Sequence, residues 1–441
     1  MLYIESAVQN LSANVLQTIR ELNLESLINK AIRKEINMVR IALISDIHFG
    51  KLSRTAEFSV PGEKIQDENS GGESLKNSMI SVLRQEKAQY ICVAGDLTSV
   101  GSPQEFLYCQ DMLLDLATQL DIPVQNILVG LGNHDIDWNI SNLHEKFPST
   151  DPEFPLERVK EQYRKIAASA PTINLESIPN PNIKGPAPFS GITETDSFVM
   201  FLLNTGWCCT QSQAISHGKL DETQLSWFRN EAAKYKTLNK WKIVLMHHHP
   251  FNYTYPVPGH DTSALEEGSN FLEIAGENGF HLVIHGHRHH PRAETTLKNS
   301  WRNPITFVCA GSFSVNSYHR SGGSIPNTLH IVELTDDIGV INLKTFQYSP
   351  AQGWIPLATN CPETPLDYTM RLGKIFSPKD IEKSIEKLSS IEGELKWDTL
   401  DECLQFMPYY RLNECIKSQL KASRKMIGLF PDDVILLERR G

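Results

Sequence analysis

The stretch VRIALISDIHFG, residues 39–50, joins a short apolar run to an aspartate and a histidine. A run such as 39–45 is typical of a strand buried inside a sheet. Asp46 and His48 follow it directly. Similar apolar runs recur along the chain, at 90–95, 126–132, 197–204, 241–247, 281–286 and 305–311. The chain is therefore expected to build its core from short buried strands.

Helical patterns separate several of these runs, at 74–87, 103–120, 221–236 and 262–278. Strands that alternate with helices favour an α/β layered domain. Two later runs, 328–335 and 339–348, are separated only by a turn, which predicts a hairpin that closes the sheet.

The remaining segments divide the chain further. Residues 1–38 have the spacing of an amphipathic helix or helix pair. Residues 50–73 are polar and rich in Gly and Ser, as in a loop, and 136–196 form a proline-rich insertion with one helix predicted at 155–169. Residues 359–441 read as a separate C-terminal helical region, with helical patterns at 378–390 and 398–428. The catalytic domain is accordingly predicted over 39–358.

Composition limits the class of protein. The chain has 441 residues and a net charge of −10, so it has no general attraction for nucleic acid. Its eight cysteines contain no CxxC pair, which favours reduced, buried thiols. We find neither a secretory signal nor a membrane span, and we expect a cytoplasmic protein with no membrane partner.

Polar side chains follow five of the predicted strands. The blocks are SDIHFG (45–50), AGDLTS (94–99), LGNHDID (131–137), MHHHPF (246–251) and HGHRHH (285–290). Ligands bind beyond the carboxyl ends of strands in open α/β sheets, so these blocks are expected to meet. Carboxylate, amide and imidazole groups suit hard or borderline divalent ions. They are too many for one tetrahedral ion, whereas a pair of ions bridged by one carboxylate would use them all.

The five blocks resemble, in order, the signature of the calcineurin-like metallophosphoesterases: D-x-H, G-D, G-N-H-[DE], H and G-H-x-H. The resemblance covers residues 39–348. It implies an αββα fold, a β-sandwich flanked by helices, with a dinuclear metal site on one edge. The extra N- and C-terminal helices would lie outside this fold.

The resemblance also implies the ligands of the first ion. Asp46, His48 and His289 would hold it, and Asp96 would bridge both ions.

Asn133 and His287 would hold the second ion together with one histidine of the triplet 247–249. In the family this ligand usually lies two residues before a proline, here Pro250, so we expect His248. His247 is the alternative.

His134 is not expected to be a ligand. By resemblance it would lie beside the phosphate, where an imidazolium could stabilise charge or protonate the leaving oxygen, and Asp135 would orient it. His281, His285 and His290 fall outside the pattern and are expected at the surface or behind the ligands. A structural role is expected for the remaining histidines: His144, His217, His260, His319 and His330. Of these, His217 and His260 could instead line the pocket.

The expected chemistry needs no protein nucleophile. Two divalent ions can lower the pKa of a bridging water towards about 7, and the resulting hydroxide would attack phosphorus in line. These ligands do not select one metal, since Mn²⁺, Fe and Zn²⁺ all suit oxygen and nitrogen donors.

A second resemblance concerns a segment between the third and fourth blocks. FLLNTG (201–206) and HGKLDETQLSWF (217–228) are similar to a segment of class III cyclic-nucleotide phosphodiesterases. The matching positions are Gly218, Leu220, Gln224, Leu225 and Trp227. The role of that helix is packing, so this resemblance supports a subfamily more than a substrate. The preferred hypothesis is hydrolysis of a small phosphodiester, such as a cyclic nucleotide.

Two alternatives stay open. The chain could be a nuclease acting on DNA or RNA, for which the candidate basic residues are Lys417, Lys421, Arg424 and Lys425. It could also be the catalytic subunit of a complex, or a homo-oligomer, that docks a protein through its terminal helices. Leu412, Ile416 and Leu420 form an apolar stripe suited to such docking.

Overall fold

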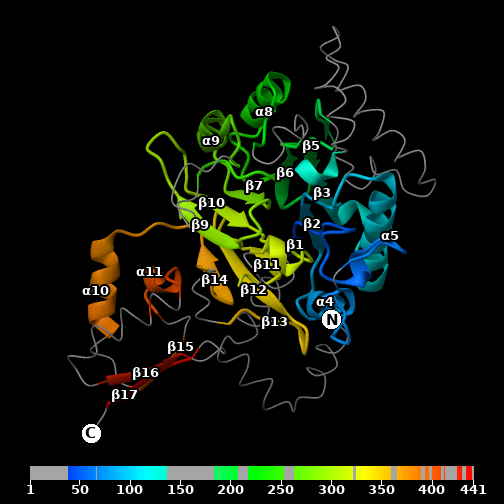
Figure 1. Ribbon diagram of the computed structural model, residues 1–441. Coiled ribbons are helices and arrows are strands. Elements are labelled where there is room, and N and C mark those ends of the chain that lie inside the picture. The colour runs from blue at the N-terminus through cyan, green and yellow to red at the C-terminus, as the bar shows by residue number, and fades with distance from the viewer. Residues whose placement is uncertain are drawn as a thin grey trace, which may run out of the picture.

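The structure is a computed structural model (Figure 1). It describes residues 38–65, 67–136, 183–187, 189–206, 217–252, 263–320, 324–358, 365–388, 393–396, 400–408, 412, 425–429 and 434–439. The helices expected within 1–37 and at 155–169 lie outside the described residues.

The opening run forms a central strand of a seven-stranded sheet. In spatial order the sheet contains β13 (Gly353–Pro356), β12 (Ile341–Ser349), β11 (Thr328–Leu334), β1 (Val39–Ile44), β2 (Tyr90–Ala94) and β3 (Ile127–Gly130), with β14 (Thr369–Leu372) paired to β12. Strands β1, β2 and β3 are parallel, so their carboxyl ends share one edge. The predicted hairpin is the antiparallel pair β11–β12.

A second seven-stranded sheet uses the later runs. Its order is β4 (Ile183–Lys184), β5 (Gly191–Glu194), β6 (Phe198–Leu202), β7 (Trp241–Leu245), β8 (Leu282–His285), β10 (Ile305–Cys309) and β9 (Arg292–Thr296). Strands β6, β7, β8 and β10 are parallel. The insertion predicted over 136–196 therefore ends too late, because β4 and β5 are strands of this sheet.

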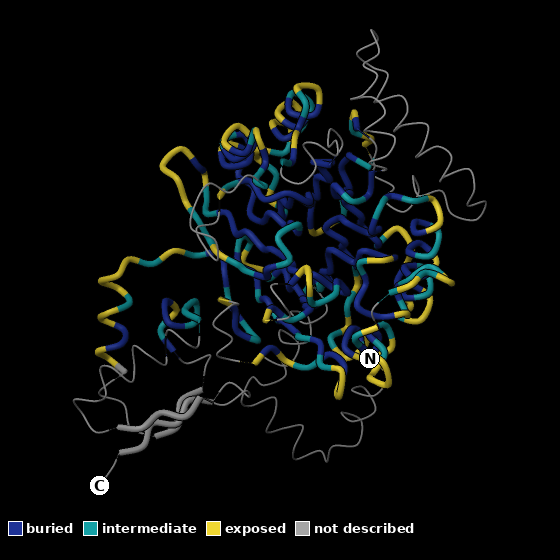
Figure 2. Tube along the Cα trace, viewed as in Figure 1, coloured by how far each residue is buried: buried dark blue, intermediate teal, exposed yellow. Residues whose placement is uncertain are grey.

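Alternating side chains along the strands create three apolar layers. On β1, Ile41 and Leu43 pack in a core shared with β6, β7 and β8, while Ala42 and Ile44 pack in a core with α4 (Leu75–Gln85) and α5 (Pro103–Leu120). A third core joins the second sheet to α8 (Glu222–Lys234) and α9 (Gly268–Glu277). Period-two alternation sends neighbouring residues to opposite faces of a sheet. The αββα sandwich is therefore confirmed, and its strands are the buried centre of the molecule (Figure 2).

Helix starts follow local chemistry. Ser102 caps α5: its hydroxyl accepts a hydrogen bond from the amide of Glu105, whose carboxylate accepts one from the amide of Ser102. Pro103 occupies the first turn, where its missing N–H costs nothing. Such signals are local, and the predicted range 103–120 matches α5.

The C-terminal part is only partly as predicted. Helix α10 (Pro378–Leu388) falls inside the predicted range 378–390, and α11 (Glu402–Gln405) is short. The prediction of a helix over 398–428 is wrong at 425–429, which form β16 (Lys425–Leu429). This strand pairs with β17 (Val434–Arg439), and β17 pairs with β15 (Gly393–Lys396). Pairing of β16 with the next strand along the chain thus overrides the local helical pattern.

Short 3-10 helices complete the description: η1 (Ala56–Phe58), η2 (Val124–Asn126), η3 (Asn133–Asp135) and η5 (Ser317–His319). None of the helices among the described residues has the length and apolar character needed to cross a membrane.

Candidate metal centre

The five polar blocks meet at one edge of the sandwich. Asp46 and His48 follow β1, Asp96 follows β2 and Asn133 follows β3, all in the first sheet. The histidines after β7 and β8 come from the second sheet. The structure brings these residues into two groups of potential metal ligands.

The first group contains Asp46, His48, Asp96 and His289. Nε2 of His48 lies 3.3 Å from Nε2 of His289 and 3.4 Å from Oδ2 of Asp96. Nε2 of His289 lies 3.1 Å from Oδ1 of Asp46. The four side chains thus point their donor atoms at one small volume.

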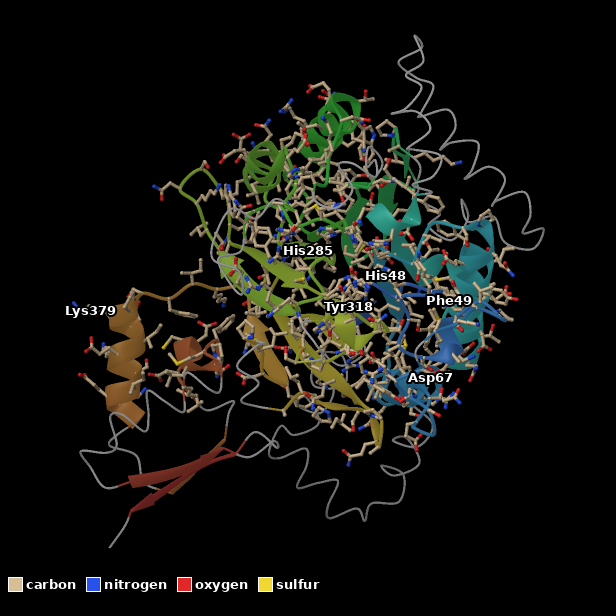
Figure 3. The ribbon with its side chains drawn as sticks, viewed as in Figure 1. His48, Phe49, Asp67, His285, Tyr318 and Lys379 are labelled. Atoms are coloured by element: carbon tan, nitrogen blue, oxygen red, sulfur yellow. The ribbon has the colours of Figure 1, made fainter. Side chains whose placement is uncertain are left out.

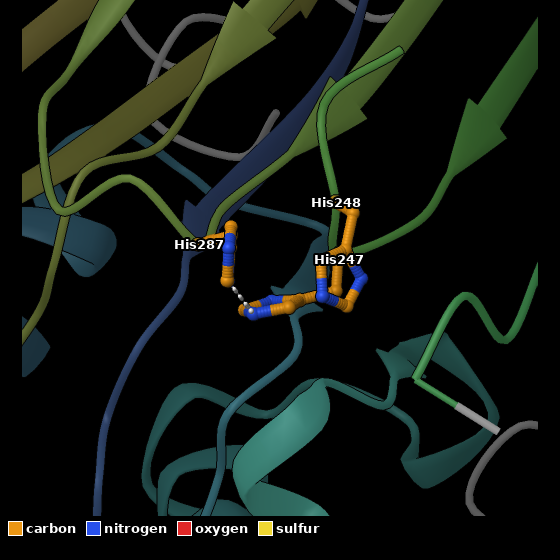
Figure 4. A group of neighbouring side chains, drawn as sticks. All are labelled: His247, His248 and His287. Carbon is orange, nitrogen blue, oxygen red and sulfur yellow. Dashed lines mark hydrogen bonds between the residues drawn. The ribbon is translucent and has the colours of Figure 1, made fainter. Parts of the chain in front are cut away.

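The second group contains His247, His248 and His287 (Figure 4). Nδ1 of His287 lies 3.3 Å from Nε2 of His247, the contact drawn as a dashed line, and 3.0 Å from Oδ1 of Asn133. Nε2 of His247 lies 3.2 Å from Oδ2 of Asp96. Oδ2 of Asp96 therefore faces both groups.

The donor atoms fit metal ions. Ligands at about 2.0–2.2 Å from one ion lie roughly 3.0–3.5 Å from each other, which is the spacing seen in both groups. Oδ1 of Asp46 is buried and has no hydrogen-bond partner, although Nε2 of His289 is 3.1 Å away. A cation between these two atoms would satisfy both.

In two histidines the ring nitrogen that faces away from the site contacts a backbone carbonyl, as is usual for metal-binding histidines. Nδ1 of His247 lies 2.7 Å from the carbonyl oxygen of Ala94, and Nδ1 of His289 lies 3.2 Å from that of His319. An Nδ1–H that donates to a carbonyl leaves the lone pair on Nε2, which in both residues is the atom inside the site.

The backbone at the site is in an unusual conformation. Of the eight described non-glycine residues with positive φ, five are expected ligands, with φ between 49° and 72°: Asp46, His48, Asp96, His287 and His289. Such backbones are costly for non-glycine residues and concentrate at functional sites.

A glycine makes room for the shared carboxylate. A Cβ placed on Gly132, in the G-N-H-D block, would collide with Oδ1 and the carboxyl carbon of Asp96. The glycine before Asn133 is therefore needed because strand β3 passes close to the end of β2.

Burial and charge set the protonation of the site. Burial, followed by neighbouring histidines, lowers the pKa of His48 and of His287 well below the usual value, so both rings are neutral, as ligands must be. Burial alone would raise the pKa of Asp96, but His247 and His134 bring it well below its ordinary value. The shared carboxylate is thus ionised.

Within the histidine triplet, His247 faces Asp96, while the expected ligand His248 also lies in the second group and has a buried Nε2 with no hydrogen-bond partner. Nδ1 of His248 lies 2.8 Å from the hydroxyl of Thr205, which also accepts a hydrogen bond from the amide of His248. Burial, and then His247, lower the pKa of His248 well below the usual value. His248 is therefore held on the second sheet, beside the ring of His287 at a centroid distance of 4.4 Å.

The segment that resembles class III phosphodiesterases supports this arrangement. Gln224 is fully buried, accepts a hydrogen bond from the amide of Asn204 and donates one to its carbonyl. These bonds fix the turn that carries Thr205. Sequence reasoning assigned this segment to packing and missed Thr205, although NTG after a strand was a visible signal.

His134 lies beside the first group, with its ring 4.5 Å from that of His48. Its amide donates to Oδ1 of Asp96, and its Nδ1 lies 2.9 Å from the carbonyl oxygen of Ser99. Asp135 accepts hydrogen bonds from Thr98 and from the amide of Gly132. Burial, followed by the charge of Asp96, raises the pKa of Asp135 to about 7. The carbonyl of Ser99 thus lies beside the ring, and the role of Asp135 in orienting it stays a prediction.

The other histidines divide as follows. His281, His285 and His290 are buried rather than at the surface. His330 bridges the hydroxyl of Thr345 and the carbonyl of Ala310, in line with a structural role. The backbone carbonyl oxygen of His319 lies beside Nδ1 of His289. His144 and His260 lie outside the described residues.

A sequence profile of the family described as calcineurin-like phosphoesterase matches residues 39–291, more than half of the chain. The chain belongs to this family. It is therefore a metallophosphoesterase, a hydrolase of phosphoric ester bonds, and its Asp/His cluster suits divalent metal ions.

Solved structures of low sequence identity are similar to this phosphoesterase. A dimetal phosphatase from Danio rerio has 12% identity and a TM-score of 0.41, with 70% of this chain and 95% of that chain covered. A purple acid phosphatase from yellow lupin (Lupinus luteus) seeds has 11% identity and a TM-score of 0.42, with 78% and 55% covered. No curated protein matches the sequence.

Proposed function

We propose that this phosphoesterase uses two divalent ions, Mn²⁺, Fe or Zn²⁺, to hydrolyse a phosphodiester in a small, nucleotide-like molecule. The observation that carries the proposal is the position of Asp96, whose Oδ2 lies within 3.4 Å of donor nitrogens in both ligand groups. One carboxylate oxygen facing two donor sets is the arrangement that a pair of ions requires.

The residues would divide the work as follows. Asp46, His48 and His289 would hold one ion, Asn133, His247 and His287 the other, and Asp96 both. When bound, the ions would supply positive charge to the phosphoryl oxygens and acidify a water molecule.

His134 would act on the substrate itself. Because its Nδ1 faces the carbonyl of Ser99, that nitrogen carries the hydrogen, and Nε2 is the atom that would exchange a proton with the leaving oxygen. The backbone bond from His134 to Asp96 keeps the ring beside the shared carboxylate.

Preference for a diester rests on the resemblance of 201–228 to class III phosphodiesterases. The contacts of Gln224 and Thr205 connect that segment to the second ligand group. The nuclease alternative depends on basic residues of which Lys417, Lys421 and Arg424 lie outside the described residues.

The test compares hydrolysis of bis-p-nitrophenyl phosphate with that of p-nitrophenyl phosphate, with Mn²⁺ or with a chelator. We expect metal-dependent cleavage of the diester. Asp96→Asn should reduce kcat by at least about a hundredfold, since it removes the negative charge that would hold both ions.

Asp115→Asn is the matched control, because Asp115 is 42% exposed on α5 and pairs with Lys76 away from the site. It should keep full activity. Cleavage of the monoester alone would point to a phosphatase, and cleavage of DNA or RNA in preference to small diesters would favour a nuclease. Equal activity with metal and with chelator would contradict the proposal.

A further inference from the structure

The turn at residues 316–320 carries an unusually exposed aromatic side chain. Tyr318, in η5, is 85% exposed, more than any other large apolar side chain among the described residues. A large aromatic ring usually buries most of its surface. The exposure of Tyr318 on an ordered turn is therefore typical of a side chain that contacts a ligand.

The turn is firmly built. Its Ser317 donates hydrogen bonds from its amide and its hydroxyl to Oε1 of Glu68, at 2.8 and 2.6 Å. The buried guanidinium of Arg320 donates to the carbonyl of Val315 and lies 3.8 Å from Glu68. The amide of Asn316 donates to the carbonyl of Leu52. The exposure of Tyr318 is therefore not that of a loose chain end.

The same turn touches the metal centre. The carbonyl oxygen of His319 lies 3.2 Å from Nδ1 of the ligand His289. The ring of Tyr318 is 5.1 Å from that of His319 and perpendicular to it. Tyr318 and His48 accordingly lie in the same part of the molecule (Figure 3).

We propose that Tyr318 is a specificity residue that stacks on a planar aromatic group of the substrate, a nucleobase, while the phosphate lies at the metal centre. The inference rests on the proposed function and adds to it the class of group attached to the phosphate. The exposed ring of Tyr318 is next to His319, whose carbonyl contacts the proposed ligand His289. This ring would give a base a flat apolar surface on which to stack.

The experiment measures binding, so it does not depend on turnover. The full-length protein, loaded with Mn²⁺, is titrated calorimetrically with the phosphonate analogues of adenosine 5′-monophosphate and of ribose 5-phosphate. Both carry the same anion, their carbon–phosphorus bond resists hydrolysis, and only the first has a base. We expect the wild type to bind the adenosine compound more tightly.

Tyr318→Ala should reduce that preference about 5- to 150-fold, the range of base–aromatic stacking, and leave the Kd of the ribose compound unchanged. Tyr318→Phe should keep the preference because it keeps the ring. Leu297→Ala, at a side chain 49% exposed, is the control and should behave as wild type.

A preference that survives in Tyr318→Ala would overturn the inference, as would a wild type without preference. Equal weakening of both compounds would show that Tyr318 only supports the fold of the site, which also overturns it. The proposed function is tested separately, by the activity assay. Absence of metal-dependent diester hydrolysis by the wild type would contradict the proposed function.

Discussion

Five side chains that we propose as metal ligands extend from backbones that non-glycine residues avoid. Each such conformation costs about 1–3 kcal/mol and persists only where the surroundings impose it. Here the imposing contacts are hydrogen bonds between blocks: the amide of Asp46 donates to Gly95, that of His48 to Asp96, and that of His287 to Oδ2 of Asp46. The last bond joins the two sheets directly at the site.

The triplet 247–249 allows a test of single residues. His247→Ala removes the ring nitrogen nearest Asp96 and should leave the protein with one bound ion in place of two. His248→Ala should keep two ions, with affinity for one of them reduced about 10- to 100-fold, as when a supporting residue is lost. Metal analysis of the purified variants and calorimetric titration measure both. Loss of an ion only in His248→Ala would restore the original expectation for that residue.

Helices α4, α5, α8 and α9 stabilise the sandwich by covering its two outer faces. The starts of α4, α5 and α8 depend on local capping: Ser74, Ser102 and Asp221 each accept a hydrogen bond from the third residue of the helix that follows. Helix α5 has the fullest cap, and its Glu105 also accepts a hydrogen bond from the amide of Val100, close to the end of the Asp96 loop. The cap thus connects α5 to the segment after β2 that carries Asp96.

Ser102→Ala removes the hydroxyl of this cap and should lower the free energy of unfolding by about 0.5–2 kcal/mol. Urea titration followed by circular dichroism measures the change. Ser81→Ala, at an exposed position within α4, is the control and should change stability by less than about 0.5 kcal/mol. Equal effects of the two substitutions would show that the cap contributes nothing specific.

Across the whole molecule, the site joins two sheets that otherwise meet through an apolar core. The first sheet supplies Asp46, His48, Asp96 and Asn133, and the second supplies His247, His287 and His289. Ions held from both sides should stabilise the native sandwich, since a ligand that binds only the folded state adds to its stability.

Removing metal with a chelator should therefore lower Tm. Free metal at about a hundred times Kd stabilises a protein by about 2.7 kcal/mol, which differential scanning calorimetry detects readily. In Asp96→Asn the shift between metal-loaded and chelated protein should be much smaller, because the shared ligand is weakened. A wild-type Tm that is the same with and without chelator would contradict a metal that bridges the sheets.

Local patterns in the sequence determined the buried strands, the capped helices and the five polar blocks, because each depends on neighbours within a few residues. The resemblance of these blocks, in order, to the calcineurin-like metallophosphoesterases implied the αββα layering and the family. Only the tertiary structure decided that β4 and β5 join the second sheet, and that Thr205, Ser99 and His319 contact site residues. These outcomes depend on atoms brought together from distant parts of the chain, such as the hydroxyl of Thr205 and the ring of His248. Adjacent histidines share the same local sequence signal, so only packing against Asp96 and Thr205 distinguishes His247 from His248.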